Sequence, residues 1–246
     1  MPRVLILGAT SGIACAVGAE FASHKYDLIL AGRNQDELLV LAGDLNIRYG
    51  IKSETLLFDV LEFQEMESTL QSCLVRVGAE LEGVVLCIGY LGDQQTAQAD
   101  PQEARRIMDS NYTGCVLALN IFANYFEDKK SGFICAISSV AGDRGRQSNY
   151  LYGSAKAGLS TYLQGLRNRL HHANVRVITV KPGFVDTRMT FGSPNLFLVA
   201  SPEAIAQGIY KAVLRGNDEV YLPWFWRFIM FAVRAIPESI FKRLRL

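Results

Sequence analysis

Gly8-Ala9-Thr10-Ser11-Gly12-Ile13-Ala14 separates the apolar run Val4–Leu7 from a segment of helical character, Gly12–Lys25. Glycine at position 8 permits a sharp turn at the end of a strand, and glycine at position 12 permits close approach of a pyrophosphate to the helix start. The free N–H groups and the positive dipole end of that helix would bind the anion. A purely structural turn is the alternative. The strand–turn–helix context favours a dinucleotide site lined by Gly8, Thr10, Ser11, Gly12 and Ile13.

Short apolar runs alternate with longer amphipathic segments along the whole chain. The runs are continuously apolar, which is typical of parallel strands buried on both faces, and strict alternation with helices indicates right-handed crossovers. No linker or repeat divides the chain. The sequence predicts a single-domain α/β protein with a doubly wound parallel sheet of the Rossmann type, long central helices and ligands at the carboxyl ends of the strands. The expected strands are Val4–Leu7, Leu28–Ala31, Thr55–Phe58, Val84–Ile88, Phe133–Ile137, Val175–Val180 and Glu219–Leu222. The expected helices are Gly12–Lys25, Gln35–Tyr49, Phe63–Val77, Pro101–Phe126, Tyr150–His172 and Pro202–Leu214.

Composition excludes several classes of function. The chain has 246 residues, 50% of them hydrophobic and 20% charged, as packed globular proteins do. Its net charge of +1 gives no electrostatic basis for nucleic-acid binding. Scattered cysteines without a C-x-x-C pair indicate thiols in a reducing compartment, and the three histidines have no metal-ligand spacing. The first apolar run is too short for a signal peptide, so we expect a cytoplasmic protein without a metal site.

The residue after the second expected strand bears on the choice of cofactor. That strand ends in Leu30-Ala31-Gly32-Arg33. An acidic side chain at this place would bind the ribose hydroxyls of NAD and repel a 2′-phosphate, whereas an arginine can pair with that phosphate. Arg33 therefore favours NADP(H), with NAD(H) as the second possibility, although a solvated loop arginine is the alternative.

Tyr152-Gly-Ser-Ala-Lys156 carries the expected acid–base chemistry. The i, i+4 spacing places the phenol and the ammonium on one face of a helix. A free tyrosine has a pKa near 10, and a nearby ammonium favours the phenolate and lowers that pKa. Tyr152 could then exchange a proton with a carbonyl oxygen. The pair alone is not specific, so its context has to support the interpretation.

Ser139 supplies part of that context. It follows the expected strand Phe133–Ile137, so its hydroxyl should face the ligand edge of the sheet. There it could hydrogen-bond a substrate oxygen as negative charge develops. A serine that only caps the next turn is the alternative.

Together the glycine turn, Ser139, Tyr152 and Lys156 resemble the short-chain dehydrogenase/reductase family, along nearly the whole chain. The resemblance implies that Ser139 positions a carbonyl, Tyr152 is the acid or base, Lys156 also binds the nicotinamide ribose, and Asn111 supports the proton relay. It implies cofactor contacts from Asp59 and Val60 after the third strand, from Gly89, and from Pro182, Gly183, Val185 and Thr187. Thr187 would contact the nicotinamide amide.

Two positions depart from the family pattern. Ala14 stands where a third glycine is usual, at the cost of one methyl group near the phosphates. Cys87-Ile88-Gly89 replaces the usual Asn-Ala-Gly, so the amide of that asparagine is missing on the adenosine side. Neither change removes a catalytic group.

The last residues differ in character from the domain expected over residues 1–222. Residues 223–246 contain both tryptophans, many apolar side chains and five basic residues against one acidic residue. Arg227 and Arg234 are seven apart and share one helical face. Such a helix suits contact with an anionic membrane surface. Packing on the domain itself and an oligomer contact are the alternatives.

A narrower resemblance points to one branch of the family. Gly89–Asp93, Asn111–Gly114, Tyr152–Leu159 and Ile236–Leu244 resemble the branch that reduces a polyprenylphosphoryl 2-keto-pentose in decaprenylphosphoryl arabinose synthesis. A lipid-linked keto-sugar would suit the apolar, basic tail and the apolar loop Phe184–Ala200, and it would place the protein at the inner face of the membrane.

The partners expected are therefore a small-molecule or lipid-linked carbonyl or alcohol, and a second copy of the chain. In the family, the helices that match Pro101–Phe126 and Tyr150–His172 pair across a two-fold axis, which implies a homodimer or homotetramer. A nicotinamide-binding regulatory or scaffold protein without turnover, and an epimerase-like relative that retains its cofactor, are the competing functions.

Overall fold

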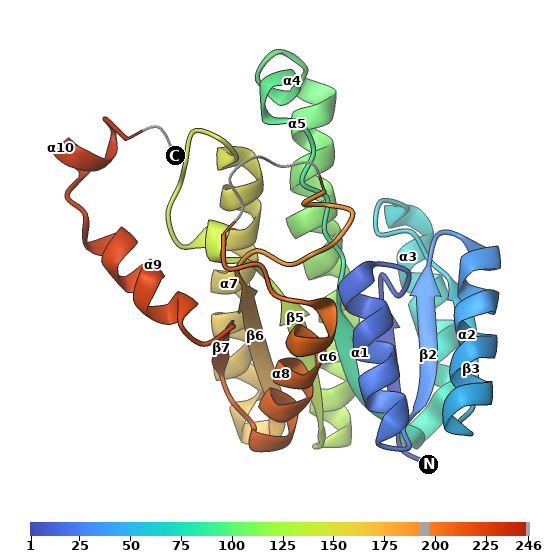
Figure 1. Ribbon diagram of the computed structural model, residues 1–246. Coiled ribbons are helices and arrows are strands. Elements are labelled where there is room, and N and C mark those ends of the chain that lie inside the picture. The colour runs from blue at the N-terminus through green and yellow to red at the C-terminus, as the bar shows by residue number, and fades with distance from the viewer. Residues whose placement is uncertain (192–196, 245–246) are drawn as a thin grey trace.

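The structure is a computed structural model, and it describes residues 1–191 and 197–244. Leu196 of the apolar loop and Arg245 of the basic tail lie outside these residues. Seven parallel strands form one sheet in the order β3-β2-β1-β4-β5-β6-β7 (Figure 1). The order reverses direction between β1 and β4, which is the switch point where ligands bind in doubly wound sheets. The predicted fold class is confirmed.

Strands and helices alternate along most of the chain. The strands are β1 (Arg3–Leu7), β2 (Asp27–Gly32), β3 (Ser53–Leu57), β4 (Leu81–Leu86), β5 (Gly132–Ile137), β6 (Val175–Pro182) and β7 (Glu219–Leu222). The helices are α1 (Gly12–Ser23), α2 (Gln35–Tyr49), α3 (Phe63–Val77), α4 (Gln94–Ala99), α5 (Pro101–Met108), α6 (Gly114–Lys129), α7 (Tyr150–Leu170), α8 (Pro202–Arg215), α9 (Trp226–Ala235) and α10 (Glu238–Phe241).

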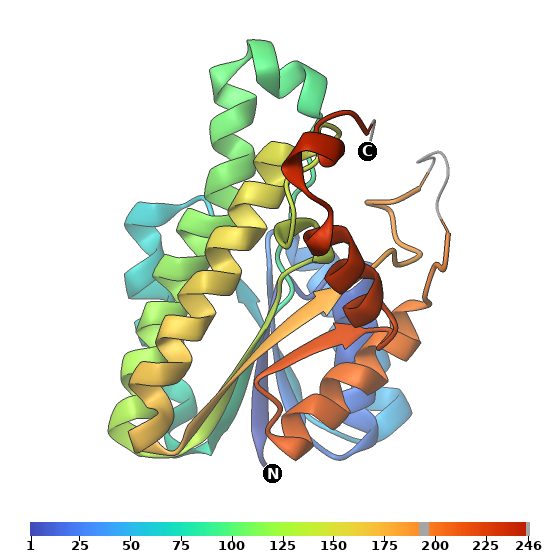
Figure 2. The same cartoon turned by 90° about the vertical axis from the view of Figure 1, so that its left-hand side faces the viewer.

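Helices cover both faces of the sheet, which explains why the strands are apolar throughout. One core lies between the sheet and α3, α6 and α7, and it contains Leu70, Phe122 and Leu163. The other lies between the sheet and α1, α2 and α8, and it contains Phe21 and Ile209. Figure 2 shows α6 and α7 side by side on one face. Burial on both faces leaves the carboxyl edge of the sheet as the place for a cleft.

The long helix predicted over Pro101–Phe126 is not uniform. It is divided by a π-helical turn, Asp109–Thr113, between α5 and α6. Directly after this turn, Gly114 lies against Val60, and a methyl group on Gly114 would meet the Val60 carbonyl oxygen at 2.2 Å. The wider turn and the missing side chain bring the helix close to the loop after β3. The pattern of apolar residues does not show such a turn, because a single wide turn is too short to have a period of its own.

α4 was not predicted from the sequence. Its six residues are too few to show a helical period, although Asp93 caps it by accepting a hydrogen bond from the Thr96 N–H at 2.6 Å. Together, α4 and α5 stand above the sheet on the side of α7 (Figure 1). They therefore form one wall above the carboxyl ends of the strands.

The tail forms two short helices that pack on the domain. Trp226 and Met230 of α9 are buried against Val140, and Phe225 and Ile229 pack around them. No helix among the described residues is long and apolar enough to span a membrane. The tail thus has one face fixed to the domain beside the segment that follows Ser139.

Candidate active site

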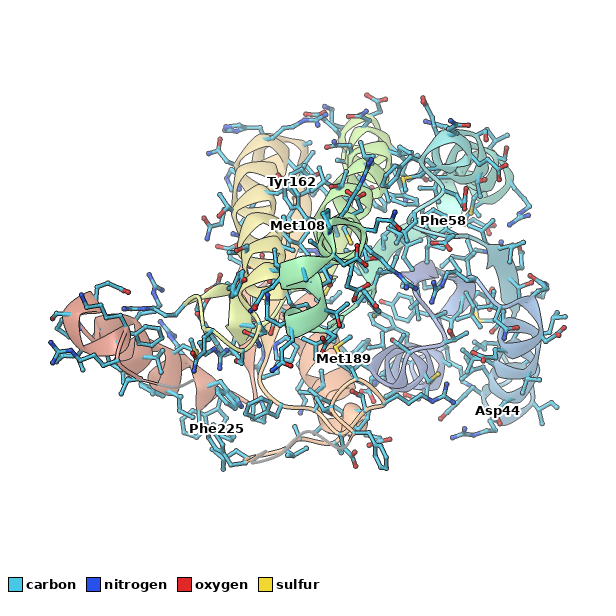
Figure 3. The ribbon with its side chains drawn as sticks, turned by 90° about the horizontal axis from the view of Figure 1, so that it is seen from above. Asp44, Phe58, Met108, Tyr162, Met189 and Phe225 are labelled. Atoms are coloured by element: carbon cyan, nitrogen blue, oxygen red, sulfur yellow. The ribbon has the colours of Figure 1, made fainter. Side chains whose placement is uncertain are left out.

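A large cleft opens at the carboxyl ends of the strands, with a volume of about 1960 Å³. Figure 3 looks down on this edge, and Met189, from the segment after β6, lies near the middle of the view. The lining comes from the loops after β1 to β6, from the α4–α5 region and from the start of α7. Seventeen site residues were proposed from the sequence, and all of them except Asn111 line this cleft. The lining residues are Gly8, Thr10, Ser11, Gly12, Ile13, Arg33, Asp59, Val60, Gly89, Ser139, Tyr152, Lys156, Pro182, Gly183, Val185 and Thr187.

The glycine turn has the geometry that a bound pyrophosphate needs. Gly8 adopts φ +82°, and a methyl group there would meet Ile88 Cγ1 at 2.9 Å. Gly12 faces Thr187, whose Cγ2 would lie 3.4 Å from an added methyl group. The Ser11 hydroxyl caps α1 by accepting from the Ala14 N–H at 3.3 Å. The turn and Thr187 therefore form opposite walls of a narrow cradle at a helix N-terminus.

Ala14, the departure from the usual third glycine, is buried in the core on the far side of this turn. Its methyl group belongs to the packing between α1 and the sheet. The structure thus accommodates this departure without loss of the cradle.

Arg33 lies at the adenosine end of the cleft. Its side chain is 67% exposed, and its Nη1 lies 4.0 Å from Asp59 Oδ2. Asp59 Oδ1 also accepts a hydrogen bond from the Leu61 N–H at 3.0 Å. The long contact and high exposure leave the guanidinium able to turn toward a ligand, since an exposed pair of this kind contributes little stability.

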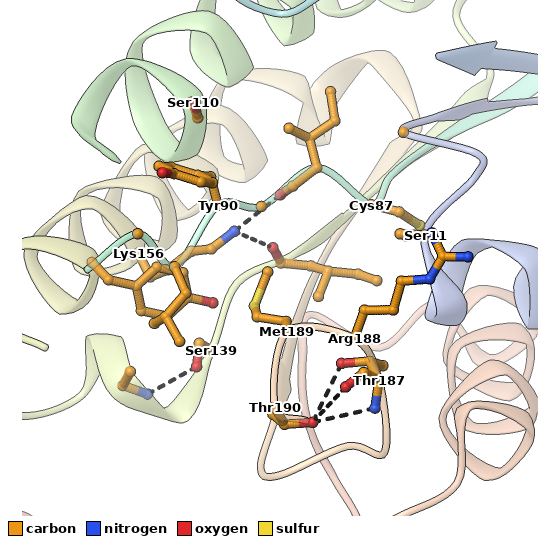
Figure 4. Close-up of a pocket in the computed structure, with 18 of the residues that line it drawn as sticks. Ser11, Cys87, Tyr90, Ser110, Ser139, Lys156, Thr187, Arg188, Met189 and Thr190 are labelled. Carbon is orange, nitrogen blue, oxygen red and sulfur yellow. Dashed lines mark hydrogen bonds between the residues drawn. The ribbon is translucent and has the colours of Figure 1, made fainter. Parts of the chain in front are cut away.

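Ser139 and Tyr152 come together from β5 and α7. The Ser139 hydroxyl accepts a hydrogen bond from the Ala141 N–H at 3.1 Å, which fixes its position at the end of the strand (Figure 4). Tyr152 is only 9% exposed, and Gly153 beside it lies against the Ala141 carbonyl oxygen. A single loop therefore holds both hydroxyl groups at the same wall of the cleft.

Lys156 lies one helical turn after Tyr152 and is almost fully buried. Its Nζ donates to the carbonyl oxygens of Ile88 at 3.2 Å and Ile137 at 3.1 Å, as Figure 4 shows. The same Nζ lies 5.7 Å from the centre of the Tyr152 ring. The ammonium is thus anchored between the ends of β4 and β5, directly under the cleft.

Burial determines the protonation of this pair. It raises the pKa of Tyr152 to about 12, although hydrogen bonding with Ser139 opposes the shift. Burial also lowers the pKa of Lys156, while the nearby Cys115 and Cys87 thiols oppose that shift. The sequence predicted that Lys156 lowers the pKa of Tyr152, and that prediction is wrong for the protein without ligands. Burial outweighs the ammonium, whose Nζ lies 5.7 Å from the centre of the Tyr152 ring.

Asn111 lies in the π-helical turn and is completely buried. Its Nδ2 donates to the carbonyl oxygens of Tyr90 at 2.6 Å and Ile107 at 2.8 Å, and its Oδ1 accepts from the Tyr90 N–H at 3.1 Å. Its Oδ1 would lie 3.5 Å from a methyl group on Gly89. The side chain therefore ties the helix to the segment after β4, next to Lys156, and both ends of its amide already have partners.

The segment after β6 closes the nicotinamide side of the cleft. Thr190 Oγ1 donates to the Val185 carbonyl oxygen at 2.6 Å, and the Thr187 N–H donates to Thr190 Oγ1 at 3.2 Å. Gly183 lies against the buried indole of Trp226, whose Nε1 would be 1.9 Å from a methyl group on Gly183. The glycine thus serves the docking of α9 as well as the path of the backbone.

A buried ionic cluster supports this segment from behind. Lys181 Nζ lies 2.8 Å from Asp143 Oδ1 and 2.9 Å from Glu219 Oε2. The Tyr221 hydroxyl donates to Asp143 Oδ2 at 2.7 Å. The cluster joins β6 and β7 to the loop between Ser139 and Tyr152.

Sequence reasoning missed several residues of the cleft. Arg188, next to Thr187, lines the same cleft as Ser11 and is labelled in Figure 4, and its guanidinium could pair with a pyrophosphate there. Its place directly after the Thr187 motif was the available signal. Gln94 and Arg146 also line the cleft. Neither has a signal in the sequence, because α4 and the loop after β5 reach the cleft only through the tertiary fold.

The residues present fit a nicotinamide dinucleotide. The cradle at Gly12 would be filled by a side chain, α1 presents its N-terminus there, and Arg33 and Arg188 lie along the same cleft. Among the described residues no group of three His, Cys, Asp or Glu side chains could hold a metal ion. Ser139, Tyr152 and Lys156 line the same cleft as this cradle.

Comparison with known proteins identifies the family. A family model described as short chain dehydrogenase matches residues 2–194. An uncharacterized oxidoreductase of Mycobacterium tuberculosis is 34% identical over 241 residues, which cover 98% of this chain and 96% of the relative. An uncharacterized oxidoreductase of Streptomyces coelicolor is 34% identical over 247 residues, which cover 99% of this chain and 96% of the relative.

Solved structures show the same fold. A short-chain dehydrogenase from Sphingobium yanoikuyae in complex with NADPH has a TM-score of 0.82 and 23% identity, over 97% of this chain and 98% of that chain. The bulky-bulky ketone specific alcohol dehydrogenase from Comamonas testosteroni has a TM-score of 0.80 and 21% identity, over 97% and 96%. The chain belongs to the short-chain dehydrogenase family and is a nicotinamide-dependent oxidoreductase.

Proposed function

We propose that the protein reduces a carbonyl to a secondary alcohol with NADP(H), and that it also catalyses the reverse oxidation. The observation that carries this proposal is the convergence of Ser139, Tyr152 and Lys156 on one wall of the dinucleotide cleft. The raised pKa of Tyr152 supports the reductive direction, because the phenol is protonated at neutral pH and can donate to a carbonyl oxygen.

Each residue has a distinct task in this proposal. The bound cofactor supplies or accepts a hydride. The Ser139 hydroxyl orients the substrate oxygen, and Tyr152 transfers the proton to it. Lys156, anchored by the Ile88 and Ile137 carbonyl oxygens, stabilises the phenolate that remains. Asn111 holds the Tyr90 backbone and so positions the floor of the cleft beside Lys156.

The test is the oxidation of NADPH in the presence of a panel of ketones that includes keto-sugars, with identification of the alcohol formed. We expect equal amounts of NADPH consumed and alcohol produced. If NADPH binds and no carbonyl is reduced above the rate without enzyme, the protein is a regulatory or scaffold protein without turnover, and the proposal is wrong.

The preference for NADP(H) over NAD(H) rests on Arg33. Its guanidinium lies in the cleft with only a long contact to Asp59, so it can pair with a 2′-phosphate. The Sphingobium yanoikuyae neighbour, whose structure is a complex with NADPH, is consistent with this choice. NADPH should raise the melting temperature more than NADH at matched concentration, and Arg33→Ala should remove the difference. Equal stabilisation of the parent protein by both would contradict the preference.

We propose a keto-sugar on a polyprenyl phosphate as the substrate. The lining of the cleft includes amide and guanidinium side chains, which suit hydroxyl groups and a phosphate, and they are Gln94, Gln95, Gln98, Arg106, Arg146, Gln147 and Asn149. Apolar side chains of the segment after β6 are open to solvent, with Met189, which lines the cleft, 40% exposed and Phe197 54% exposed. A polar head group with an apolar chain matches this division.

We propose that the tail rests on an anionic membrane surface. In α9 the side chains of Phe228 and Phe231 are exposed, as is Trp224 just before it, while Arg227 and Arg234 lie on the same helix. Exposed aromatic groups beside cations suit an interface with acidic lipids. The protein should co-sediment with vesicles that contain acidic lipids. The double variant Trp224→Ser with Phe228→Ser should lose this co-sedimentation. Equal sedimentation of that variant would contradict the proposal.

The oligomer is proposed to form through α6 and α7. Their outer faces carry exposed Leu117, together with small residues such as Thr161 and Gly165 that permit close approach of another helix. Light scattering at micromolar concentration should give the mass of a dimer or tetramer. A monomer mass would contradict this expectation.

A further inference from the structure

Unpartnered polar atoms gather at one end of the cleft. Among the described residues, six buried side-chain nitrogen or oxygen atoms have no hydrogen-bond partner, and three of them belong to Gln94, Arg146 and Asn149. All three residues line the cleft. Buried polar groups without partners are uncommon and costly, so three around one cavity point to a ligand that supplies their partners.

Gln94 is fixed in orientation by the helix that carries Tyr152. Its Oε1 accepts a hydrogen bond from the Leu151 N–H at 3.0 Å, which ties α4 to the start of α7. The amide can therefore offer only its Nε2 to the cleft, and this nitrogen is a donor. Leu151, whose N–H holds the Gln94 amide, is adjacent to Tyr152.

Arg146 is a cation whose nearest carboxylate is committed to other groups. Asp143, three residues earlier, is paired with Lys181 at 2.8 Å and accepts from the Tyr221 hydroxyl at 2.7 Å. Burial lowers the pKa of Arg146, and Asp143 opposes the shift only in part. A partly buried guanidinium whose Nε is buried without a partner is favoured by an anion that enters the cleft.

The neighbouring arginine of the same loop shows the contrast. Arg144 donates to the carbonyl oxygens of Arg234 at 3.0 Å and Ile236 at 2.9 Å, and to Glu238 Oε2 at 2.7 Å. It therefore anchors the tail and has its partners within the protein. Of the two arginines in this loop, Arg146 is the one that lines the cleft.

Asn149 is the third residue of this group. It occupies the N-cap position of α7, but its side chain makes no capping hydrogen bond, and its Oδ1 is buried without a partner. The site thus offers donors from Gln94 and Arg146 and an acceptor from Asn149. One anionic group and one hydroxyl group on the same ligand would satisfy this set.

We propose that Gln94, Arg146 and Asn149 form a specificity subsite for a hydroxylated substrate that carries a phosphate ester beside its carbonyl. Arg146 binds the phosphate oxygens, and the two amides bind the sugar hydroxyl groups. This deepens the proposed reductase function, on which it rests, by assigning the residues that select the substrate. The phosphate can belong to a soluble sugar ester or to a lipid head group, and the experiment separates the two sources.

The test measures binding to the complex of the enzyme with NADPH, where an alcohol product cannot be oxidised. Calorimetry gives the Kd of methyl-phosphoryl arabinofuranose, of neutral methyl arabinofuranoside and of farnesyl-phosphoryl arabinofuranose. We expect the phosphate to tighten binding by ~10- to 100-fold over the neutral sugar, as a charge-assisted hydrogen-bond pair would. A further gain with the farnesyl chain identifies the lipid-linked source, and equal affinity identifies the soluble ester.

Arg146→Gln should remove the preference for the phosphate, and Arg146→Lys should keep part of it. The matched control is Arg105→Gln. Arg105 is an exposed residue of α5 that pairs with Asp109, and it does not line the cleft. An unchanged NADPH affinity shows that each variant is folded. Equal binding of both sugars by the parent protein, or a preference that survives Arg146→Gln, overturns the subsite. Failure of the reductase function itself has a separate readout, the absence of ketone reduction, which these binding constants do not involve.

Discussion

At the scale of the residue, burial is the dominant influence on the pKa of Tyr152. It raises the pKa of Tyr152 to about 12, and the Ser139 hydroxyl offsets this only partly. Lys156 cannot reverse the shift in the free protein, because its ammonium is held by two backbone carbonyl oxygens. The phenol therefore holds its proton across the neutral range and is prepared for donation rather than abstraction.

The rate of alcohol oxidation should consequently rise with pH. Oxidation needs the phenolate, and below the pKa its fraction increases about tenfold for each pH unit. Carbonyl reduction needs the phenol and should change little between about pH 6 and 8. Initial rates in both directions over this range test the expectation, and an oxidation rate independent of pH would contradict it.

Gly183 offers a second prediction at this scale. A methyl group there would overlap the Trp226 indole, with Nε1 at 1.9 Å, so Gly183→Ala must displace the tryptophan. We expect the free energy of unfolding to fall by about 1–3 kcal/mol, the usual cost of overpacking. Gly43→Ala on α2 is the control, because an added methyl group there meets nothing within 4 Å. Urea unfolding that shows equal stability for the two variants would exclude this role of Gly183.

At the scale of the element, the sequence predicted the strands and most helices because burial on both faces of the sheet produces continuous apolar runs. It predicted the residues of the glycine turn and of the Tyr152 helix because local spacing fixes their geometry. It missed α4, which is too short to show a period, and the π-helical turn at Asn111. It could not show that Gln94 and Arg146 share one end of the cleft, since that depends on how distant elements pack.

The tail helices depend on one side chain of the active-site loop. Arg144 binds the carbonyl oxygens at the end of α9 and Glu238, and its guanidinium lies 4.1 Å from the centre of the Phe241 ring. Arg144→Ala should therefore speed amide hydrogen exchange across residues 231–241 by loosening the docked tail. Arg215→Ala, on exposed surface at the end of α8, serves as the control. Unchanged exchange in the Arg144 variant would show that apolar packing alone holds the tail.

At the scale of the whole molecule, the ionic cluster of Lys181, Asp143, Glu219 and Tyr221 connects β6 and β7 to the loop between Ser139 and Tyr152. The tail covers this region from outside. The cleft therefore depends on parts of the chain that are far from the glycine turn in sequence.

Removal of the cation from this cluster should destabilise the whole domain. Lys181→Met leaves the buried Asp143 carboxylate without its opposite charge, and we expect the free energy of unfolding to fall by about 3–5 kcal/mol. Urea unfolding at neutral pH measures the loss. A loss below about 1 kcal/mol, the worth of an exposed pair, would show that the cluster is solvated.

The most direct test of the account is the single-turnover rate of NADPH oxidation by Tyr152→Phe, measured by rapid mixing with an accepted ketone. The account predicts a rate ~10²- to 10⁴-fold below that of the parent enzyme, with the affinity for NADPH unchanged, because only the proton donor is lost. A variant that transfers hydride as fast as the parent enzyme would contradict the assignment of Tyr152 as the acid.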